Sequence, residues 1–179
     1  MSLLFRRSFP LLLLAVAILS GCRPQEALNW KISATSPDDF DTWTEQTNRL
    51  LPVELRKELA RAAVFIQGDS GISERHSKST NLNNPFCRRI DRKTIRHVLL
   101  DGYFVEKKFL ANRVSLEMEN ILALEIRMDL HAVGSKENER FAKSVEYREQ
   151  LIQTMKLRIA EIEVRAGSLN RQREASRLK

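Results

Sequence analysis

Residues 110–128 read LANRVSLEMENILALEIRM and residues 141–169 read FAKSVEYREQLIQTMKLRIAEIEVRAGSL, and both stretches repeat at steps of four and three. The first seam consists of Leu110, Val114, Glu117, Ile121, Leu124 and Met128. The second consists of Phe141, Val145, Arg148, Ile152, Met155, Ile159, Ile162, Ala166 and Leu169. This heptad spacing predicts two long helices, each with one charged residue in an apolar seam.

The two seams lie in proline-free stretches of equal length, residues 92–133 and 136–177, separated by Gly134 and Ser135. A glycine that ends one helix and a serine that caps the next indicate a tight connection. We therefore expect an antiparallel helical hairpin, about 60 Å long at 1.5 Å per residue.

The register follows from the tip, because facing residues in an antiparallel pair have numbers with a constant sum, here about 269. This register pairs Leu124 with Val145. It also places Gly102 opposite Gly167, which indicates a close backbone approach, a shared hinge or a coincidence. The charged seam residues Glu117 and Arg148 either pair and fix the register or extend out to solvent.

Outside the hairpin, Ser36 followed by Pro37, Asp38 and Asp39 is typical of a helix start. Pro52 should end that helix and begin a second one, which stops near Gly68. The predicted fold class is all-α: two short N-terminal helices over residues 36–67 and a long, coiled-coil-like antiparallel hairpin over residues 91–179.

Residues 68–90 are expected to form an irregular loop, since residues 68–86 are rich in Ser, Asn, Gly and Lys. Loops of this length are commonly functional or disordered. We expect Asn84 and Pro85 to form the turn that ends it and Asp91 to cap the next helix.

The 179 residues, 42% hydrophobic and 30% charged, allow one domain, over residues 36–179, and exclude a large multidomain enzyme. Two cysteines are too few for a disulfide scaffold.

The first residues have the pattern of a secretory signal peptide. Arg6 and Arg7 precede an unbroken apolar run over residues 11–19, which is too short for a membrane span of about 20 residues. The run ends in Leu19-Ser20-Gly21-Cys22, which resembles the lipobox of bacterial lipoproteins. The resemblance covers residues 1–22 only.

In that class the cysteine thiol receives a diacylglyceryl group, the signal is cut before the cysteine, and the new amino group is acylated. The resemblance thus implies that Cys22 is the first mature residue and carries the lipid, with residues 22–35 as a flexible tether. An aspartate after the cysteine tends to retain such proteins in the inner membrane. Arg23 stands there instead, so the resemblance implies the periplasmic face of the outer membrane.

Two basic runs should meet where the hairpin opens, because one lies at the start of its first helix and the other at the end of its second. The expected docking patch consists of Arg88, Arg89, Arg92, Lys93, Arg96, Arg171, Arg173, Arg177 and Lys179. Anionic lipid, lipopolysaccharide or an acidic surface on an envelope protein are the expected partners. The envelope location argues against nucleic acid.

No sequence motif indicates catalysis or a metal site: the chain has three histidines but no HExxH, CxxC, phosphate loop or GxSxG. We expect no enzyme and no cofactor beyond the covalent lipid on Cys22. Cys87 has two interpretations. Arg88 and Arg89 lower its pKa and make it a reactive thiol or a disulfide partner, or it is a small buried residue beside Phe86.

Two functions fit these features. One is a membrane-anchored helical scaffold or adaptor that docks on another envelope component. The alternative is a periplasmic sensor, a chaperone-like protein or a ligand-binding module, with its site between the short helices and the start of the hairpin.

Overall fold

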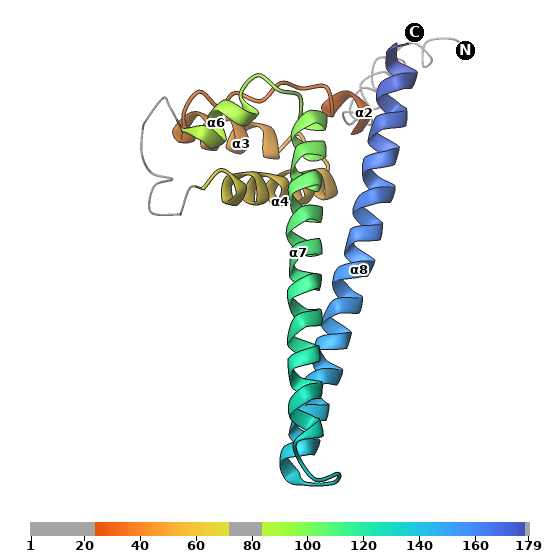
Figure 1. The fold of residues 1–179 in the computed structure, drawn as a ribbon. Coiled ribbons are helices and arrows are strands. Elements are labelled where there is room, and N and C mark those ends of the chain that lie inside the picture. The colour runs from red at the N-terminus through yellow and green to blue at the C-terminus, as the bar shows by residue number, and fades with distance from the viewer. Residues whose placement is uncertain (1–23, 72–83, 178–179) are drawn as a thin grey trace, which may run out of the picture. The chain divides into compact units, whose positions relative to one another are not determined.

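The computed structural model describes residues 24–71 and 84–177, and all regular elements within them are helices (Figure 1). They are α2 (Pro24–Ala27), α3 (Pro37–Asn48), α4 (Val53–Asp69), α6 (Pro85–Ile90), α7 (Ile95–Asp129) and α8 (Lys136–Arg177). The predicted all-α class is confirmed.

The chain divides into two compact units. Within the described residues, the N-terminal unit contains residues 24–61 and 84–98, and the hairpin unit contains residues 62–71 and 99–177. Helices α4 and α7 each contribute residues to both units.

In the N-terminal unit, α3 begins as its sequence predicts. The Ser36 hydroxyl accepts a hydrogen bond from the backbone N–H of Asp39 at 3.2 Å, and Pro37 occupies the first helical turn. Phe40 on α3 packs edge to face against Phe86 on α6, with 5.3 Å between the ring centroids. The cap therefore fixes α3 where its aromatic residue can join the core of this unit.

The segment expected to be a flexible tether is instead part of this core. Leu28, Ile32 and Ala34 are buried. The backbone N–H of Ile32 donates to the Lys93 carbonyl, and its carbonyl accepts from the N–H of Arg92, both at 2.9 Å. Buried Ile32 and Ala34 alternate with exposed polar neighbours, which is the period of two found in extended strands. The segment has no helical periodicity, and for that reason it was predicted to be a tether.

The predicted irregular loop is shorter than expected, because it gives way to α6. The Asn84 side chain accepts hydrogen bonds from the N–H groups of Phe86 and Cys87, at 2.9 and 3.3 Å, and so caps this helix. Asparagine followed by proline is an N-terminal helix signal here and not only a turn. Residues 72–83 of the predicted loop lie outside the described residues.

Helix α7 starts at Ile95, three residues later than predicted. Asp91 was expected to cap it, but its carboxylate accepts from the backbone N–H of Ala34 at 3.0 Å. Arg92 has a left-handed backbone with φ of 57°. The Thr94 hydroxyl instead accepts from the N–H of His97 at 3.4 Å, which is the bond of an N-cap.

In the hairpin unit, α7 and α8 run side by side and antiparallel, joined by a short tip (Figure 1). Gly134 at the tip has φ of 81°, which suits glycine, and the Ser135 hydroxyl accepts from the N–H of Asn138 at 3.2 Å. The Asn138 amide reaches across and donates to the Met128 carbonyl at 3.1 Å. The predicted hairpin is confirmed, but α7 ends at Asp129, before the predicted end at residue 133, so the tip is longer than Gly134 and Ser135.

Of the interpretations of Gly102 and Gly167, a close approach between the two glycines is wrong. A Cβ atom on Gly102 would lie 2.6 Å from the backbone Cα of Ala62 in α4, whereas a Cβ on Gly167 would meet only the Arg171 guanidinium, at 3.6 Å. The Phe65 and Phe109 rings continue this contact, with centroids 5.9 Å apart. The close approach at Gly102 is therefore to α4, the third helix of the unit.

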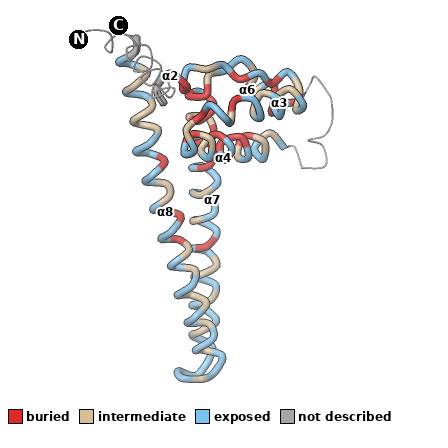
Figure 2. Tube along the Cα trace, turned by 180° about the vertical axis from the view of Figure 1, so that it is seen from behind, coloured by how far each residue is buried: buried red, intermediate tan, exposed pale blue. Residues whose placement is uncertain are grey.

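Burial is uneven along the hairpin (Figure 2). Ile152, Met155 and Ile162 of the α8 seam are buried, but residues 118–151, which include the tip, contain no buried residue. None of the helices in residues 24–71 and 84–177 is both long and apolar enough to cross a membrane.

Candidate functional site

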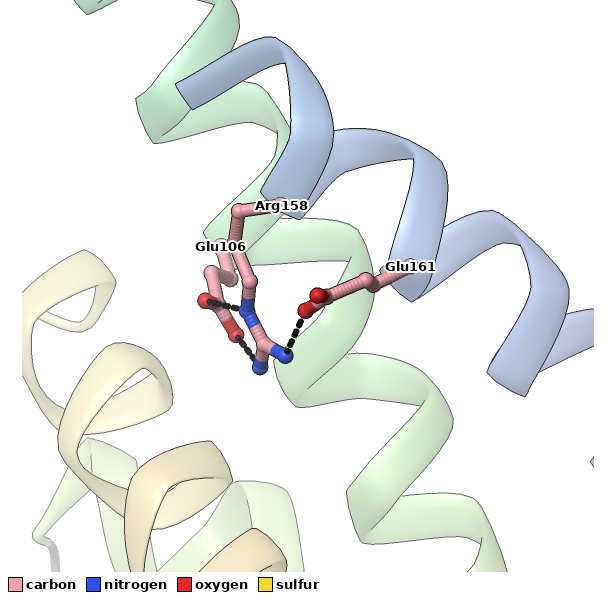
Figure 3. Close-up of polar contacts among 3 residues, drawn as sticks. All are labelled: Glu106, Arg158 and Glu161. Atoms are coloured by element: carbon pink, nitrogen blue, oxygen red, sulfur yellow. Dashed lines mark hydrogen bonds and ion pairs between the residues drawn. The ribbon is translucent and has the colours of Figure 1, made fainter. Parts of the chain in front are cut away.

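A buried ion pair joins the two long helices in the first half of α7 (Figure 3). The Arg158 guanidinium donates from Nε to Oε1 of Glu106 at 2.9 Å and from Nη2 to Oε2 at 3.2 Å, a two-pronged contact. Its remaining nitrogen, Nη1, bonds Glu161 one turn along α8 at 3.1 Å. The hydrogen bonds to Glu106 raise the pKa of Arg158 above its ordinary value, although burial opposes the shift.

A second ion pair lies closer to the tip, at the two charged seam residues. Arg148 on α8 and Arg113 on α7 both contact the Glu117 carboxylate, Arg113 at 2.9 Å, and the Glu117 side chain is only 1% exposed. Desolvation is the largest single effect and would raise the pKa of Glu117. The hydrogen bond and charge of Arg148, the hydrogen bond from Asn120 and the charge of Arg113 together outweigh it, so the pKa falls below its ordinary value. The prediction that Glu117 and Arg148 pair is confirmed.

The two clusters define one antiparallel register. Glu117 follows Glu106 along α7, and its partner Arg148 precedes Arg158, the partner of Glu106, by nearly the same number of residues along α8. Both pairs therefore fit the same antiparallel alignment of the two helices. A slip by one turn would leave a buried carboxylate away from its arginine, which typically destabilises a protein by several kcal/mol. Glu106 lies outside the predicted seam, so the heptad pattern did not select it, although its opposition to Arg158 follows from the Glu117 pair.

Most of the predicted docking residues on the N-terminal unit lie at its surface. Arg88, Arg92 and Lys93 are exposed and Arg89 is partly exposed. We call these four residues the basic turn. Arg96 does not belong with them, because it is 4% exposed and its position on the first turn of α7 directs it into the interior.

The backbone of the basic turn is held in place at several points. Arg92 bonds Ile32 through its backbone, and its guanidinium lies 3.6 Å from the Asp91 carboxylate while its side chain stays 86% exposed. The N–H of Asp91 donates to the Cys87 carbonyl at 2.8 Å, which closes the end of α6. The turn therefore presents its cations on an ordered backbone.

The other predicted bases belong to the hairpin unit or lie beyond the described residues. Arg171 is exposed and Arg173 partly exposed on α8. The side chain of Arg177, all of Lys179 and the lipidation residue Cys22 lie outside the described part of the chain. That the two basic groups converge stays a prediction.

Cys87 is a buried free thiol, so the prediction of a reactive cysteine is wrong. Burial raises its pKa to about 11, and the nearby carboxylate of Asp91 adds to the shift. The flanking Arg88 and Arg89 do not offset these effects. The second interpretation, a small buried residue beside the buried Phe86, is confirmed.

Sequence reasoning missed the apolar residues on the outside of α7. The exposed apolar side chains on α7 and directly after it are Phe104, Phe109, Leu116, Met118, Leu122, Ile126 and Leu130, although the Phe109 ring packs on Phe65 of α4. Met118 and Leu122 belong to a shallow groove of about 440 Å³ between α7 and α8, which Ile121 and Ile152 also line. Apolar residues outside the heptad seam were the available signal.

The histidines form no metal site in the part of the chain that the structure describes. His97 bonds the Thr94 hydroxyl at 2.7 Å, and His131 packs on Phe141, while His76 lies outside the described residues. No group of three His, Cys, Asp or Glu side chains among the described residues could hold a metal ion. No family model, curated protein or solved structure matches this chain.

Proposed function

We propose that this chain is a lipid-anchored adaptor of the bacterial envelope, which uses the basic turn to dock on an acidic surface of another envelope protein. The sequence Leu19-Ser20-Gly21-Cys22 supports the anchor. The observation that supports docking is the set of cations held at the surface by the end of α6 and by the fixed backbone that follows it.

The anchor rests on the chemistry of acylation. Each buried CH2 group contributes about 0.8 kcal/mol, and two or three acyl chains on one residue exceed what stable membrane attachment requires. Replacing Cys22 with serine removes the thiol that would accept the diacylglyceryl group. The Cys22→Ser chain should accumulate as an unprocessed precursor without acyl label. Normal processing and labelling of that variant would refute the anchor.

Arg88 and Arg89 lie in the last turn of α6, where the helix dipole favours cations, but helix stability does not account for Arg92 and Lys93. Arg92 and Lys93 directly precede the N-terminus of α7, where the helix dipole favours anions and disfavours cations. Arg92 also adopts a left-handed backbone, which costs a residue other than glycine roughly 1–2 kcal/mol. Two cations at an unfavourable position on a strained turn support a role outside the fold, and an acidic protein surface has the complementary charge.

A charge-reversal pair with a matched control tests the docking role. The Arg92→Glu and Lys93→Glu double variant should lose a protein that co-purifies with the wild-type chain from detergent-solubilised membranes. The control, Arg140→Glu with Lys143→Glu, changes the net charge equally at two exposed sites on α8.

Docking through the basic turn requires that the control retains the partner and that added salt weakens the wild-type complex. If both variants bind the partner as the wild type does, the basic turn is a solvated surface. Binding of the purified chain to anionic vesicles with no co-purifying protein would instead identify lipid headgroups as the partner.

A further inference from the structure

Residues 28–34, which we call the strap, bind the basic turn through their backbone. The N–H of Ile32 donates to the Lys93 carbonyl, and the Ile32 carbonyl accepts from the N–H of Arg92, both at 2.9 Å. The Ile32 side chain is 1% exposed, so it holds the strap in the core of the N-terminal unit. Arg92 and Lys93 are therefore fixed by a segment about sixty residues away in the sequence.

The strap also holds the residue that precedes these two cations. The N–H of Ala34 donates to the Asp91 carboxylate at 3.0 Å. Inside the turn, the N–H of Asp91 donates to the Cys87 carbonyl at 2.8 Å, and the N–H of Lys93 donates to the Ile90 carbonyl at 3.1 Å. Hydrogen bonds from the strap therefore supplement those that the turn makes within itself.

The conformation of the turn is unfavourable by itself. Arg92 has a left-handed backbone with φ of 57°, which residues other than glycine rarely adopt. Arg92 and Lys93 also precede the N-terminus of α7, where the helix dipole disfavours positive charge. A backbone with such costs persists only when the surrounding structure determines it. The strap supplies the surrounding contacts on one side of the turn.

We propose that the strap controls docking through the basic turn: Arg92 and Lys93 keep the docking conformation only while the strap is paired. This inference rests on the docking function proposed above. Because pairing and docking depend on the same backbone conformation, pairing of the strap strengthens docking, and docking strengthens the pairing to the same extent. The strap begins six residues after Cys22, so the segment that would carry the lipid leads directly into the docking site.

Two alanine variants of the full-length chain provide the first test, by co-purification from detergent-solubilised membranes. Leu28→Ala with Ile32→Ala removes two buried side chains of the strap and should raise its open population at least about a hundredfold. This strap variant should lose most of the protein that co-purifies with the wild type. The control, Ile152→Ala with Ile162→Ala, removes two buried side chains on α8 and should retain it. Retention of the partner by the strap variant, or equal loss in both variants, would overturn the proposal.

A disulfide between strap and turn makes the test reversible within one protein. Lys31 and Thr94 face each other in an antiparallel bridge, and the Cα atoms of such a non-hydrogen-bonded pair lie about 4.5 Å apart, which a disulfide can span. Lys31→Cys and Thr94→Cys are added to the strap variant in a Cys87→Ser background. The oxidised chain should recover the partner and the reduced chain should lose it again. Failure of the formed disulfide to restore the partner would contradict control by the strap.

Hydrogen exchange of the chain alone separates this inference from the docking function. The N–H groups of Asp91 and Lys93 bond inside the turn and not to the strap, so their exchange reports on the turn itself. Their exchange should become at least about tenfold faster in the strap variant and slow again when the disulfide forms. Unchanged exchange at both residues would refute the coupling. If exchange changes as expected but no protein co-purifies even with the wild type, the docking function fails and the coupling of strap and turn stands.

Discussion

Replacing Gly102 with alanine should destabilise the hairpin unit, although alanine is the better helix former. Gly102 lies inside α7, where α4 comes so close that an added Cβ would fall 2.6 Å from the Cα of Ala62 and 3.1 Å from its carbonyl oxygen. Real Cβ atoms do not approach a backbone carbon to that distance. The variant can therefore form only if α4 moves away from α7.

The magnitude follows from two opposing terms. Alanine in place of glycine stabilises a helix interior by roughly 1 kcal/mol, while overpacking typically costs 1–3 kcal/mol. Because the contacted atoms belong to the α4 backbone and not to a flexible side chain, the cost should reach about 3 kcal/mol. The net loss is then about 2 kcal/mol, or a fall in Tm of about 4–8 °C for a chain of this length.

Gly167 provides the matched control, since it also lies inside a helix of the same unit. An added Cβ there would meet only the flexible end of Arg171 at 3.6 Å, so Gly167→Ala should stabilise the protein by up to about 1 kcal/mol. Urea unfolding followed by far-ultraviolet circular dichroism measures both changes. A Gly102→Ala protein as stable as the wild type would show that α4 does not pack closely on α7 there.

Three further predictions concern charged and buried groups. Because the pKa of Glu117 is lower in the folded than in the unfolded chain, its carboxylate stabilises the fold above the unfolded pKa, and this stability is lost as the pH falls through the folded pKa. Arg148→Met removes the main group that lowers the pKa of Glu117. The variant should therefore unfold at a higher pH than the wild type in an acid titration followed by circular dichroism. The pKa of the Cys87 thiol is raised from 9.0 to about 11, so little reactive thiolate is present at pH 8. In the Cys22→Ser chain, alkylation of Cys87 should be at least about a hundredfold slower in the folded protein than in urea. Equal rates would contradict the burial of Cys87. Arg92→Gly relieves a left-handed backbone and should leave the urea midpoint unchanged or raise it, by no more than about 1 kcal/mol in free energy; a loss above that value would show that the side chain stabilises the turn.

The hairpin could be predicted because its determinants are local and periodic. Apolar seams, the glycine at the tip and the serine after it each act within a few residues. The predicted register placed Glu117 and Arg148 about one turn apart, and their pairing was one of two alternatives that the sequence left open. The α3 cap was likewise predictable, since Ser36 and Pro37 act on the helix that they begin.

The features that were missed depend on contacts between distant parts of the chain. Ile32 bonds the backbone of Arg92 and Lys93 some sixty residues later, and backbone hydrogen bonds carry little sequence signature. Asp91 could cap a helix or bond Ala34, and only the packed N-terminal unit decides between them. Gly102 had two possible neighbours, and the sequence did not reveal that α4 would be the one.

Burial of Cys87 shows the same limit for chemistry. From the sequence, the two adjacent arginines are expected to lower the pKa of Cys87 and favour its thiolate. In the structure, desolvation raises that pKa, and three carboxylates raise it further, with Asp91 contributing most among them. A thiol's reactivity depends on its whole surroundings and not on its neighbours in the chain.

The pairing of residues 28–34 with residues 91–96 has a mechanical consequence. Its backbone bonds join Leu28 to Arg96, Trp30 to Ile95, and Ile32 to Arg92 and Lys93. Because the two segments are antiparallel, tension entering at residue 24 loads these bonds one after another, beginning at Leu28, in the manner of a zipper. We expect the segment to peel away before any helix is stretched and to release roughly 20 Å of extended chain at about 3.3 Å per residue. The pairing would then be the first part of the unit to open under tension from the N-terminus.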